Sequence, residues 1–232
     1  MTPSSTGRSM QIKGRNKIPQ GAAGFTLVEL LIAVAISGIV MGGIYSVYLS
    51  QQTSYTAQAQ ATAMEQNVRA AVYFMQRDIS MAGCDPSGTA HAGILTATAH
   101  AIRLTEDLNG DGDAAEYNED ISYSLYTSGG IQKLGRKTPF TASNQPVAEG
   151  VDVLDFVYLD GARHVLPTPV SDPSKIRSVQ VTLLVRSDRP DPHYLNTIVY
   201  RNQSGDVIFG PGNDHFRRRL LTVEVRCRNL AF

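Results

Sequence analysis

The 232-residue chain has a formal net charge of zero and 42% hydrophobic residues, which suits one domain plus an anchor rather than two large domains. Residues 1–24 hold four of the 21 basic residues and none of the 21 acidic ones, so residues 25–232 carry a net charge of −4. A mildly acidic chain argues against a general nucleic-acid binder, whose affinity comes mainly from neutralising phosphates, and no nucleic-acid partner is expected.

The first predicted element is an apolar run from Gly24 to about Tyr45 that contains a single charge, Glu29. About 20 apolar residues are long enough to cross a bilayer as a helix. A carboxylate near the membrane centre costs on the order of 3 kcal/mol or more, so we interpret Glu29 as a functional residue that pairs with a cation. The alternative is a plain signal anchor in which this glutamate has no role.

The segments before this run are ordered differently from those of an ordinary secretory signal, in which cleavage follows the apolar part. In this chain four basic residues and the small-residue stretch 21–24 precede the apolar segment. Cleavage at that stretch would leave the hydrophobic helix on the mature protein. The basic residues also hold their end of the helix in the cytoplasm, which puts the bulk of the chain outside it, in the periplasm of a cell with two membranes.

Helical patterning continues from the apolar run to about residue 82, where Gly83 and the Asp85-Pro86 pair stop it. The second half is amphipathic, because apolar residues recur every three or four positions, at Ala61, Met64, Val68, Ala71, Val72, Met75, Ile79 and Ala82. The sequence therefore divides into a leader (1–24), a transmembrane or assembly half of the helix (25–52), an amphipathic half (53–83) and a globular head (84–232).

From about residue 94 the pattern changes to short β segments separated by turn residues. The predicted strands are Ile102–Leu104, Ile121–Tyr126, Val153–Leu159, Val179–Arg186, Thr197–Arg201, Val207–Phe209 and Leu220–Arg228. The predicted fold class is α+β, with a long N-terminal helix packed on a mainly antiparallel β-sheet.

An acidic loop follows the first predicted strand. Oxygen-bearing side chains stand at every second position from Asp107, with Gly112 in sixth place, which matches the start of a calcium loop. The twelfth residue is Asn118 rather than Glu, so Glu116 or Glu119 would have to close the site. The alternative is a polar hairpin loop whose side chains cap the turn. The candidate calcium ligands are Asp107, Asn109, Asp111, Asp113, Glu116 and Glu119.

The two cysteines are Cys84, at the end of the long helix, and Cys227, at the end of an alternating strand that faces the core. A compartment outside the cytoplasm permits disulfides. A Cys84–Cys227 bridge and two buried free thiols are both consistent with this placement.

No catalytic motif stands out. The five histidines show no metal-ligand spacing, and neither a serine nor a cysteine nucleophile lies in a recognisable motif. We therefore expect that the protein is not an enzyme and that it binds no organic cofactor. The alternative from the class of enzymes is a membrane-anchored hydrolase.

The basic leader followed by GFTLVELLIAVAISGIV resembles the type IV prepilin class III signal. The resemblance implies that residues 1–24 are a prepilin leader and that a prepilin peptidase cuts between Gly24 and Phe25. It also implies that the peptidase methylates the new Phe25 amine. Glu29 would then pair with the cationic N-terminal amine of a neighbouring subunit during assembly.

Looser motifs in the head are similar to those of PilW-type minor pilins. They include Asp78 followed by Met81-Ala82-Gly83, the segment Leu134–Arg136, and the runs Val151–Leu159, Ile176–Arg186 and Arg217–Leu230. This resemblance implies the type IV pilin fold and a minor pilin that helps to initiate or cap type IV pili.

The same resemblance implies the partners and the location of the protein. The partners would be other minor pilins, the major pilin, the prepilin peptidase and the inner-membrane assembly platform. The protein would lie in the inner membrane and afterwards in the fibre. A minor pseudopilin of type II secretion shares this layout, and a pilus-tip adhesin or DNA-uptake subunit is a further alternative.

Overall fold

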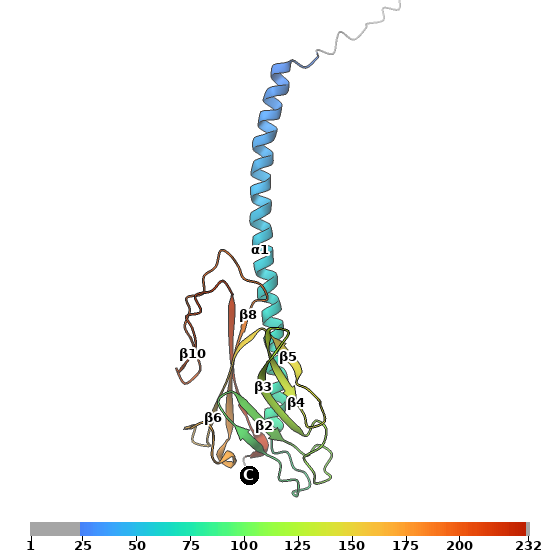
Figure 1. Cartoon of the computed structure of the whole chain (residues 1–232), viewed down its shortest axis with the longest axis vertical. Helices are drawn as coiled ribbons and strands as arrows, with labels where there is room; N and C mark the ends of the chain where they lie inside the picture. The colour runs from blue at the N-terminus through green and yellow to red at the C-terminus, as the bar shows by residue number, and fades with distance from the viewer. Residues whose placement is uncertain (1–23, 231–232) are drawn as a thin grey trace, which may run out of the picture. The chain divides into compact units, whose positions relative to one another are not determined.

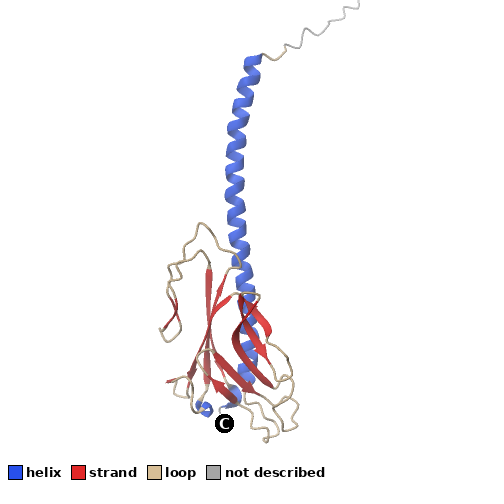
Figure 2. Ribbon diagram, in the orientation of Figure 1, coloured by secondary structure: helices blue, strands red, loops and turns tan. Residues whose placement is uncertain are grey.

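The structure, a computed structural model, describes residues 24–230, so the predicted leader lies outside the described residues except for Gly24. The chain divides into two compact units, one ending at Gln51 and the other beginning at Gln52. The long N-terminal helix is confirmed as α1 (Leu27–Met81), which Figure 2 shows without a break.

The first half of α1 is apolar and exposed. Every residue from Gly24 to Thr56 is exposed, including large side chains such as Leu30 and Ile39. Within the described part of the chain, α1 is the helix long and apolar enough to cross a membrane by length and composition. This exposed apolar surface is typical of a segment whose environment is lipid or other helices.

The second half of α1 buries one face, as its periodicity predicts. The buried positions are Met64, Val68, Ala71, Val72, Met75, Asp78 and Ile79, whereas Ala61 is exposed and its assignment to this face is wrong. The helix ends where Gly83 adopts a φ of +79°, and the Gly83 N–H donates to the Thr105 carbonyl at 3.0 Å. Glycine suits this left-handed position because it lacks a Cβ.

The strands of residues 24–230 form three antiparallel sheets (Figure 1). The five-stranded sheet has the spatial order β1 (Ile94–Ala97), β2 (Ala101–Thr105), β3 (Asp120–Ser128), β4 (Ile131–Lys137) and β5 (Gln145–Glu149). The four-stranded sheet has the order β11 (Arg218–Arg226), β8 (Ser178–Arg186), β6 (Val151–Leu159) and β7 (Val165–Leu166). A ribbon pairs β10 (Val207–Phe209) with β9 (Tyr200–Arg201), and two 3-10 turns occupy Pro173–Lys175 and Arg228–Leu230.

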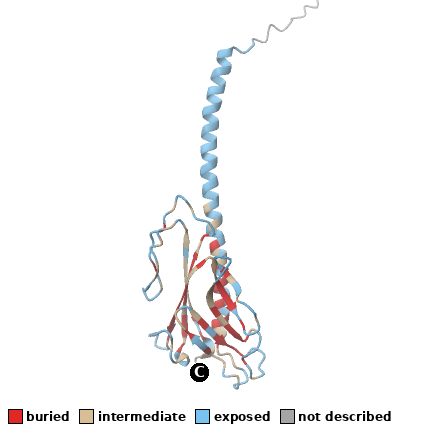
Figure 3. Cartoon of the chain, in the orientation of Figure 1, coloured by how far each residue is buried: buried red, intermediate tan, exposed pale blue. Residues whose placement is uncertain are grey.

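One core joins the second half of α1 to both large sheets (Figure 3). Met75 and Ile79 of α1, Leu134 of β4, and Leu154 and Val181 of the four-stranded sheet are fully buried in it. Full burial of such a side chain contributes roughly 1.5–3 kcal/mol. The α+β class and the packing of the helix on antiparallel strands are thereby confirmed.

The head differs from the prediction in its number of sheets and strands. A single sheet was expected, but the strands separate into two large sheets and a ribbon. Four strands were missed, namely β1, β4, β5 and β7. The segment Thr197–Arg201 is a strand only at its last two residues, because the Asn196 side chain accepts from the Ile198 N–H and turns the chain there. The last strand, β11, ends one residue before Cys227.

Candidate functional site

The N-terminal end of α1 holds the residues of the predicted processing site. Gly24 and Phe25 precede the first helical residue, and Phe25 is 91% exposed. Their peptide bond is therefore outside the hydrogen bonds of the helix and open to a peptidase. Cleavage after Gly24 and methylation of Phe25 stay predictions.

Glu29 forms a capping box with Thr26 at this helix end. Its Oε2 accepts hydrogen bonds from the Thr26 N–H and hydroxyl, each at 2.9 Å. The Thr26 Oγ1 accepts in return from the Glu29 N–H at 3.2 Å. Two donors of the same chain thus bind one oxygen of the carboxylate, which lowers the cost of holding it in an apolar environment. Pairing of Glu29 with a neighbour's amine stays a prediction.

The acidic loop at residues 107–119 is a turn whose side chains cap its own backbone. Asp107 accepts from the N–H groups of Gly110 (2.6 Å) and Gly112 (3.2 Å), and both glycines have a positive φ. Three further side chains each accept from the backbone N–H two residues later: Asn109, Asp111 and Asp113. Such Asx turns are the turn-capping alternative predicted for this loop.

The two glutamates proposed to close a calcium site differ in their surroundings. Glu116 is exposed and accepts from the Asn109 amide at 3.1 Å, and nearby negative charges, that of Asp111 first, raise its pKa. Glu119 is buried, and its Oε1 accepts from the Leu108 N–H at 2.8 Å. In the part of the chain that the structure describes, no group of three acidic, histidine or cysteine side chains is placed to hold a metal ion. Calcium binding stays a prediction.

The two cysteines are free thiols in the structure. Cys227 is buried, and burial raises the pKa of its thiol to about 12. Cys84 is partly buried, and desolvation followed by the charge of Glu106 raises its pKa as well. Both thiols are therefore protonated near neutral pH, which makes them poor nucleophiles. Formation of a Cys84–Cys227 bridge outside the cytoplasm stays a prediction, as does the free-thiol alternative.

A charge cluster around the buried Asp78, whose role the sequence did not indicate, joins α1 to the five-stranded sheet. Asp78 is fully buried, and its Oδ2 accepts from the Tyr123 hydroxyl at 2.7 Å and from Arg136 Nε at 2.9 Å. Its Oδ1 accepts from Arg77 Nε at 2.8 Å. We call these four residues the Asp78 cluster. Burial first, and then the charge of Asp78, raise the pKa of Tyr123, so its hydroxyl remains a donor.

Glu106 lies beside this cluster and is 4% exposed. Its Oε2 is buried and has no hydrogen-bond partner, and the same is true of Arg136 Nη2. Desolvation first, and then the charge of Asp78, raise the pKa of Glu106 to about 7. A carboxyl group with such a pKa changes charge near neutral pH, unlike an exposed glutamate.

Two family models match the chain. Residues 20–45 match the prokaryotic N-terminal methylation motif, and residues 123–229 match Type IV Pilus-assembly protein W. The second match extends from β3 to just beyond β11, and the first covers the exposed apolar end of α1 together with Gly24, Phe25 and Glu29. The predicted N-terminal motif and the PilW-type resemblance are thereby confirmed.

A type IV-like pilin from Thermus thermophilus is among the solved structures that are similar. It is 15% identical, the comparison covers 72% of this chain and 98% of that one, and the TM-score is 0.47. No curated protein matches the sequence.

Proposed function

We propose that this chain, a type IV pilin-like protein with a PilW domain, is a minor pilin that helps to initiate or cap the assembly of type IV pili. The observation that carries the proposal is the attachment of an exposed apolar half-helix with a methylation motif to a folded PilW head. Such a protein associates with other pilins and with the assembly machinery. The family matches point to a structural protein rather than an enzyme.

The proposed sequence of events follows from the exposed apolar surface of α1. The precursor inserts with its basic end in the cytoplasm and its head in the periplasm, since basic residues stay on the cytoplasmic side. A prepilin peptidase then cuts after Gly24 and methylates Phe25. The assembly platform extracts the helix, whose apolar surface exchanges lipid for the helices of other minor pilins and of the major pilin.

Glu29 has two roles in this scheme. In the membrane the Thr26 cap donates two hydrogen bonds to one oxygen of its carboxylate. In the fibre a cationic amine of a neighbouring subunit replaces these donors and fixes the axial register, because an unpaired charge in an apolar bundle is costly. This exchange of the Thr26 donors for a neighbour's amine selects the position at which the subunits join.

Substitution of Glu29 tests the proposal. Glu29→Val should reach the membrane at normal levels, whereas the number of pili per cell should fall at least about tenfold, because the charge pair that fixes the register is lost. The measurement is a pilus count by electron microscopy, with Edman degradation of the membrane protein to check that it begins at Phe25. A Glu65→Ala variant, altered on the head half of the helix, is the control. Normal piliation of Glu29→Val would refute the proposed role of Glu29.

Deletion of the gene separates the proposed function from its rivals. Loss of fibres and of twitching with normal enzyme secretion supports a minor pilin. Loss of enzyme secretion with normal fibres instead identifies a minor pseudopilin of type II secretion. Normal fibres that fail only in adhesion or DNA uptake identify a tip subunit.

A further inference from the structure

In the described part of the chain, three of the four edge strands of the two large sheets are poor templates for further pairing. The edge strand β1 has four residues and a register shift, and β5 contains Pro146 and a register shift. The edge strand β7 has two residues, and next to it the Phe156 N–H of β6 donates to the Ala99 carbonyl at 2.8 Å. Short, bulged and proline-containing edges resist pairing with other chains. The fourth edge strand, β11, has nine residues, no proline and no register shift against β8.

The hydrogen bonds at the two ends of β11 show which of its backbone groups point away from β8. The Arg217 carbonyl accepts from the Ser187 N–H at 2.8 Å, and the Cys227 N–H donates to the Arg177 carbonyl at 3.0 Å. Along an antiparallel pair, residues that bond to the partner strand alternate with residues that face away from it. The odd-numbered residues of β11 therefore bond to β8. Four even-numbered residues direct their N–H and C=O groups to the open edge: Leu220, Thr222, Glu224 and Arg226.

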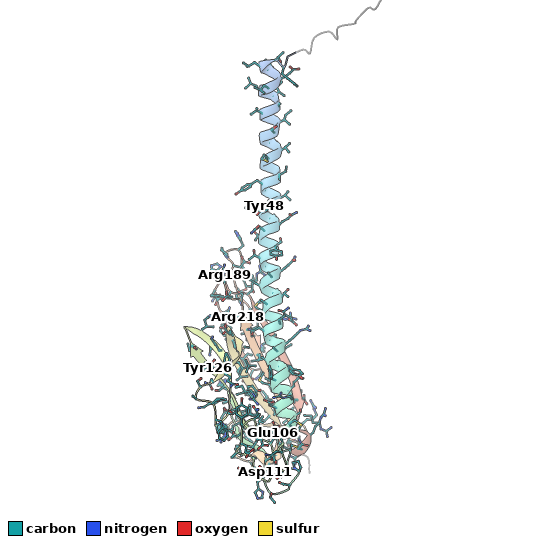
Figure 4. All side chains as sticks on the ribbon, turned by 90° about the vertical axis from the view of Figure 1, so that its right-hand side faces the viewer. Tyr48, Glu106, Asp111, Tyr126, Arg189 and Arg218 are labelled. Carbon is teal, nitrogen blue, oxygen red and sulfur yellow. The ribbon has the colours of Figure 1, made fainter. Side chains whose placement is uncertain are left out.

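This edge is accessible along most of its length. Arg218, labelled in Figure 4, is the first residue of β11, and its guanidinium binds Asp152 and Asp214. Val225 is the one buried residue of β11, whereas seven of the nine residues of β8 are buried. A groove of about 380 Å³ lies between α1 and the last residues of β11. The open edge therefore borders a groove that another chain can enter.

Two unpaired arginines make this groove basic. Arg226 and Arg228 line it and are exposed, and within residues 24–230 neither forms an ion pair. The other charged residues of the lining are engaged in ion pairs, Arg77–Asp78 and Glu224–Arg163. The excess charge of the groove is thus positive and comes from the end of β11.

A second excess of positive charge lies nearer the start of the strand. Arg219 and Arg69 share one carboxylate, that of Glu65. Like charges on neighbouring strands destabilise their pairing, whereas opposite charges stabilise it. The arginines of this edge therefore discourage a basic strand and favour a strand that carries carboxylates.

We propose that the open edge of β11 binds an extended acidic peptide segment as an additional strand of the four-stranded sheet. The backbone of this segment pairs with the outward N–H and C=O groups of Leu220, Thr222, Glu224 and Arg226. Side chains along a strand alternate between two faces, so carboxylates at every second position of the segment lie beside Arg226 and Arg228. This binding surface belongs to the folded head and does not depend on the proposed function.

Two capped peptides of about seven residues, a usual strand length, test the charge of the partner. One alternates glutamate with valine, and the other alternates lysine with valine. Each carries a fluorescent label, and its binding to the full chain in non-ionic detergent micelles is followed by anisotropy at about 50 mM salt, with empty micelles as the blank. The acidic peptide should bind at least about tenfold more tightly than the basic one. Equal binding of the two peptides, or no binding of the acidic one, would overturn the proposal.

Charge reversal locates the binding surface. Arg226→Glu/Arg228→Glu should reverse the preference, so that the lysine peptide binds more tightly than the glutamate peptide. Lys137→Glu/Arg201→Glu is the matched control, because it changes the same total charge at two exposed positions outside this edge, and it should keep the wild-type preference. A wild-type preference in Arg226→Glu/Arg228→Glu, or the same reversal in both double variants, contradicts the proposal.

Hydrogen exchange distinguishes strand addition from simple attraction between charges. In the free protein the amides of Leu220, Thr222, Glu224 and Arg226 should exchange faster than those of the odd-numbered residues between them. Saturation with the acidic peptide should slow exchange at these four amides at least about fivefold and leave the odd-numbered ones unchanged. Nuclear magnetic resonance resolves the individual amides of the full chain in micelles. Binding of the acidic peptide without this protection would mean that it only adsorbs to the arginines, and the proposed strand addition would be wrong.

Discussion

Two carboxylates on α1, Glu29 and Asp78, satisfy their hydrogen bonds in opposite ways. Glu29 lies on the exposed apolar half and uses donors of Thr26, three positions away. Asp78 is fully buried and uses Tyr123 and Arg136, which are 45 and 58 positions away. Because its donors are local, Glu29 can keep them when the helix moves from one environment to another. Asp78 is bound by residues of distant strands, and it therefore fixes the helix to the head. The two halves of one helix are thus suited to assembly and to folding, respectively.

The largest expected effect comes from removing the buried member of this pair. Asp78→Ala leaves two guanidinium groups and the Tyr123 hydroxyl without their acceptor, so we expect the free energy of unfolding to fall by about 3–5 kcal/mol. Urea denaturation of the full chain in micelles measures it. The control is Glu65→Ala, since Glu65 forms partly exposed ion pairs with Arg69 and Arg219, and such pairs contribute up to about 1 kcal/mol. If Asp78→Ala lowers the free energy of unfolding by less than about 1 kcal/mol, Asp78 does not anchor the helix, and the contrast with Glu29 does not hold.

Glu106 adds a pH dependence to the anchored half. Folding raises its pKa from 4.5 to about 7, so between these values the folded state keeps a proton that the unfolded chain has released. The stabilisation is fully present below pH 4.5 and is lost as the pH rises from 4.5 through 7, by about 3 kcal/mol in total. Denaturation midpoints from pH 4.5 to 8 measure this slope.

Glu106→Gln should flatten that slope and unfold later than the wild type at pH 8. Asp188→Asn, a substitution of an exposed acid, should keep the wild-type slope. A slope that persists unchanged in Glu106→Gln would assign the pH dependence to another group.

Loss of the capping box on the exposed half of α1 should reduce stability by less than loss of Asp78 or ionisation of Glu106. Thr26→Val removes the hydroxyl that donates to Glu29 and accepts from its N–H, and loss of such a cap costs about 1 kcal/mol, or a fivefold change in local opening. Hydrogen exchange at residues 27–30 of the full chain in micelles should be about five times faster, while exchange in β8 stays unchanged. Thr26→Ser keeps the hydroxyl and should exchange like the wild type. Equal rates in Thr26→Val would mean that the Thr26 side chain contributes nothing to holding Glu29.

Local features of this chain could be predicted from the sequence, and long-range ones could not. The buried face of α1 follows from the spacing of Val68, Met75 and Ile79, which depends on the helix alone. Glu29 stands out for the same reason, because its immediate neighbours are apolar. Tyr123 and Arg136, the distant partners of Asp78, lie on β3 and β4, so neither they nor the unpaired atoms of Glu106 and Arg136 show in a local pattern.

The strands that the sequence did not predict also depend on long-range pairing, with the exception of the hairpin turn before β4. In β4, charged residues such as Lys133 hide the alternation, and β5 begins with a proline in second place. The split into two sheets depends on which strands pair across the core, a choice that no single segment records. The turn between β3 and β4 could have been predicted, because a two-residue Gly-Gly turn is a hairpin signal. Gly129 and Gly130 both have a positive φ in the structure.

The smallest expected effect concerns the acidic loop, where the charges are again satisfied locally. Its Asx turns use side-chain oxygens for the backbone, and the raised pKa of Glu116 reports crowding among the carboxylates. A cation would relieve this repulsion, so we expect 1 mM calcium to stabilise the head by about 0.4 kcal/mol for a dissociation constant near 1 mM, or about 1 °C in melting temperature. An Asp107→Ala/Asp111→Ala variant should show no rise. An equal rise in that variant, or none in the wild type, would leave turn capping as the function of these side chains, because the loop would then hold its shape without a metal.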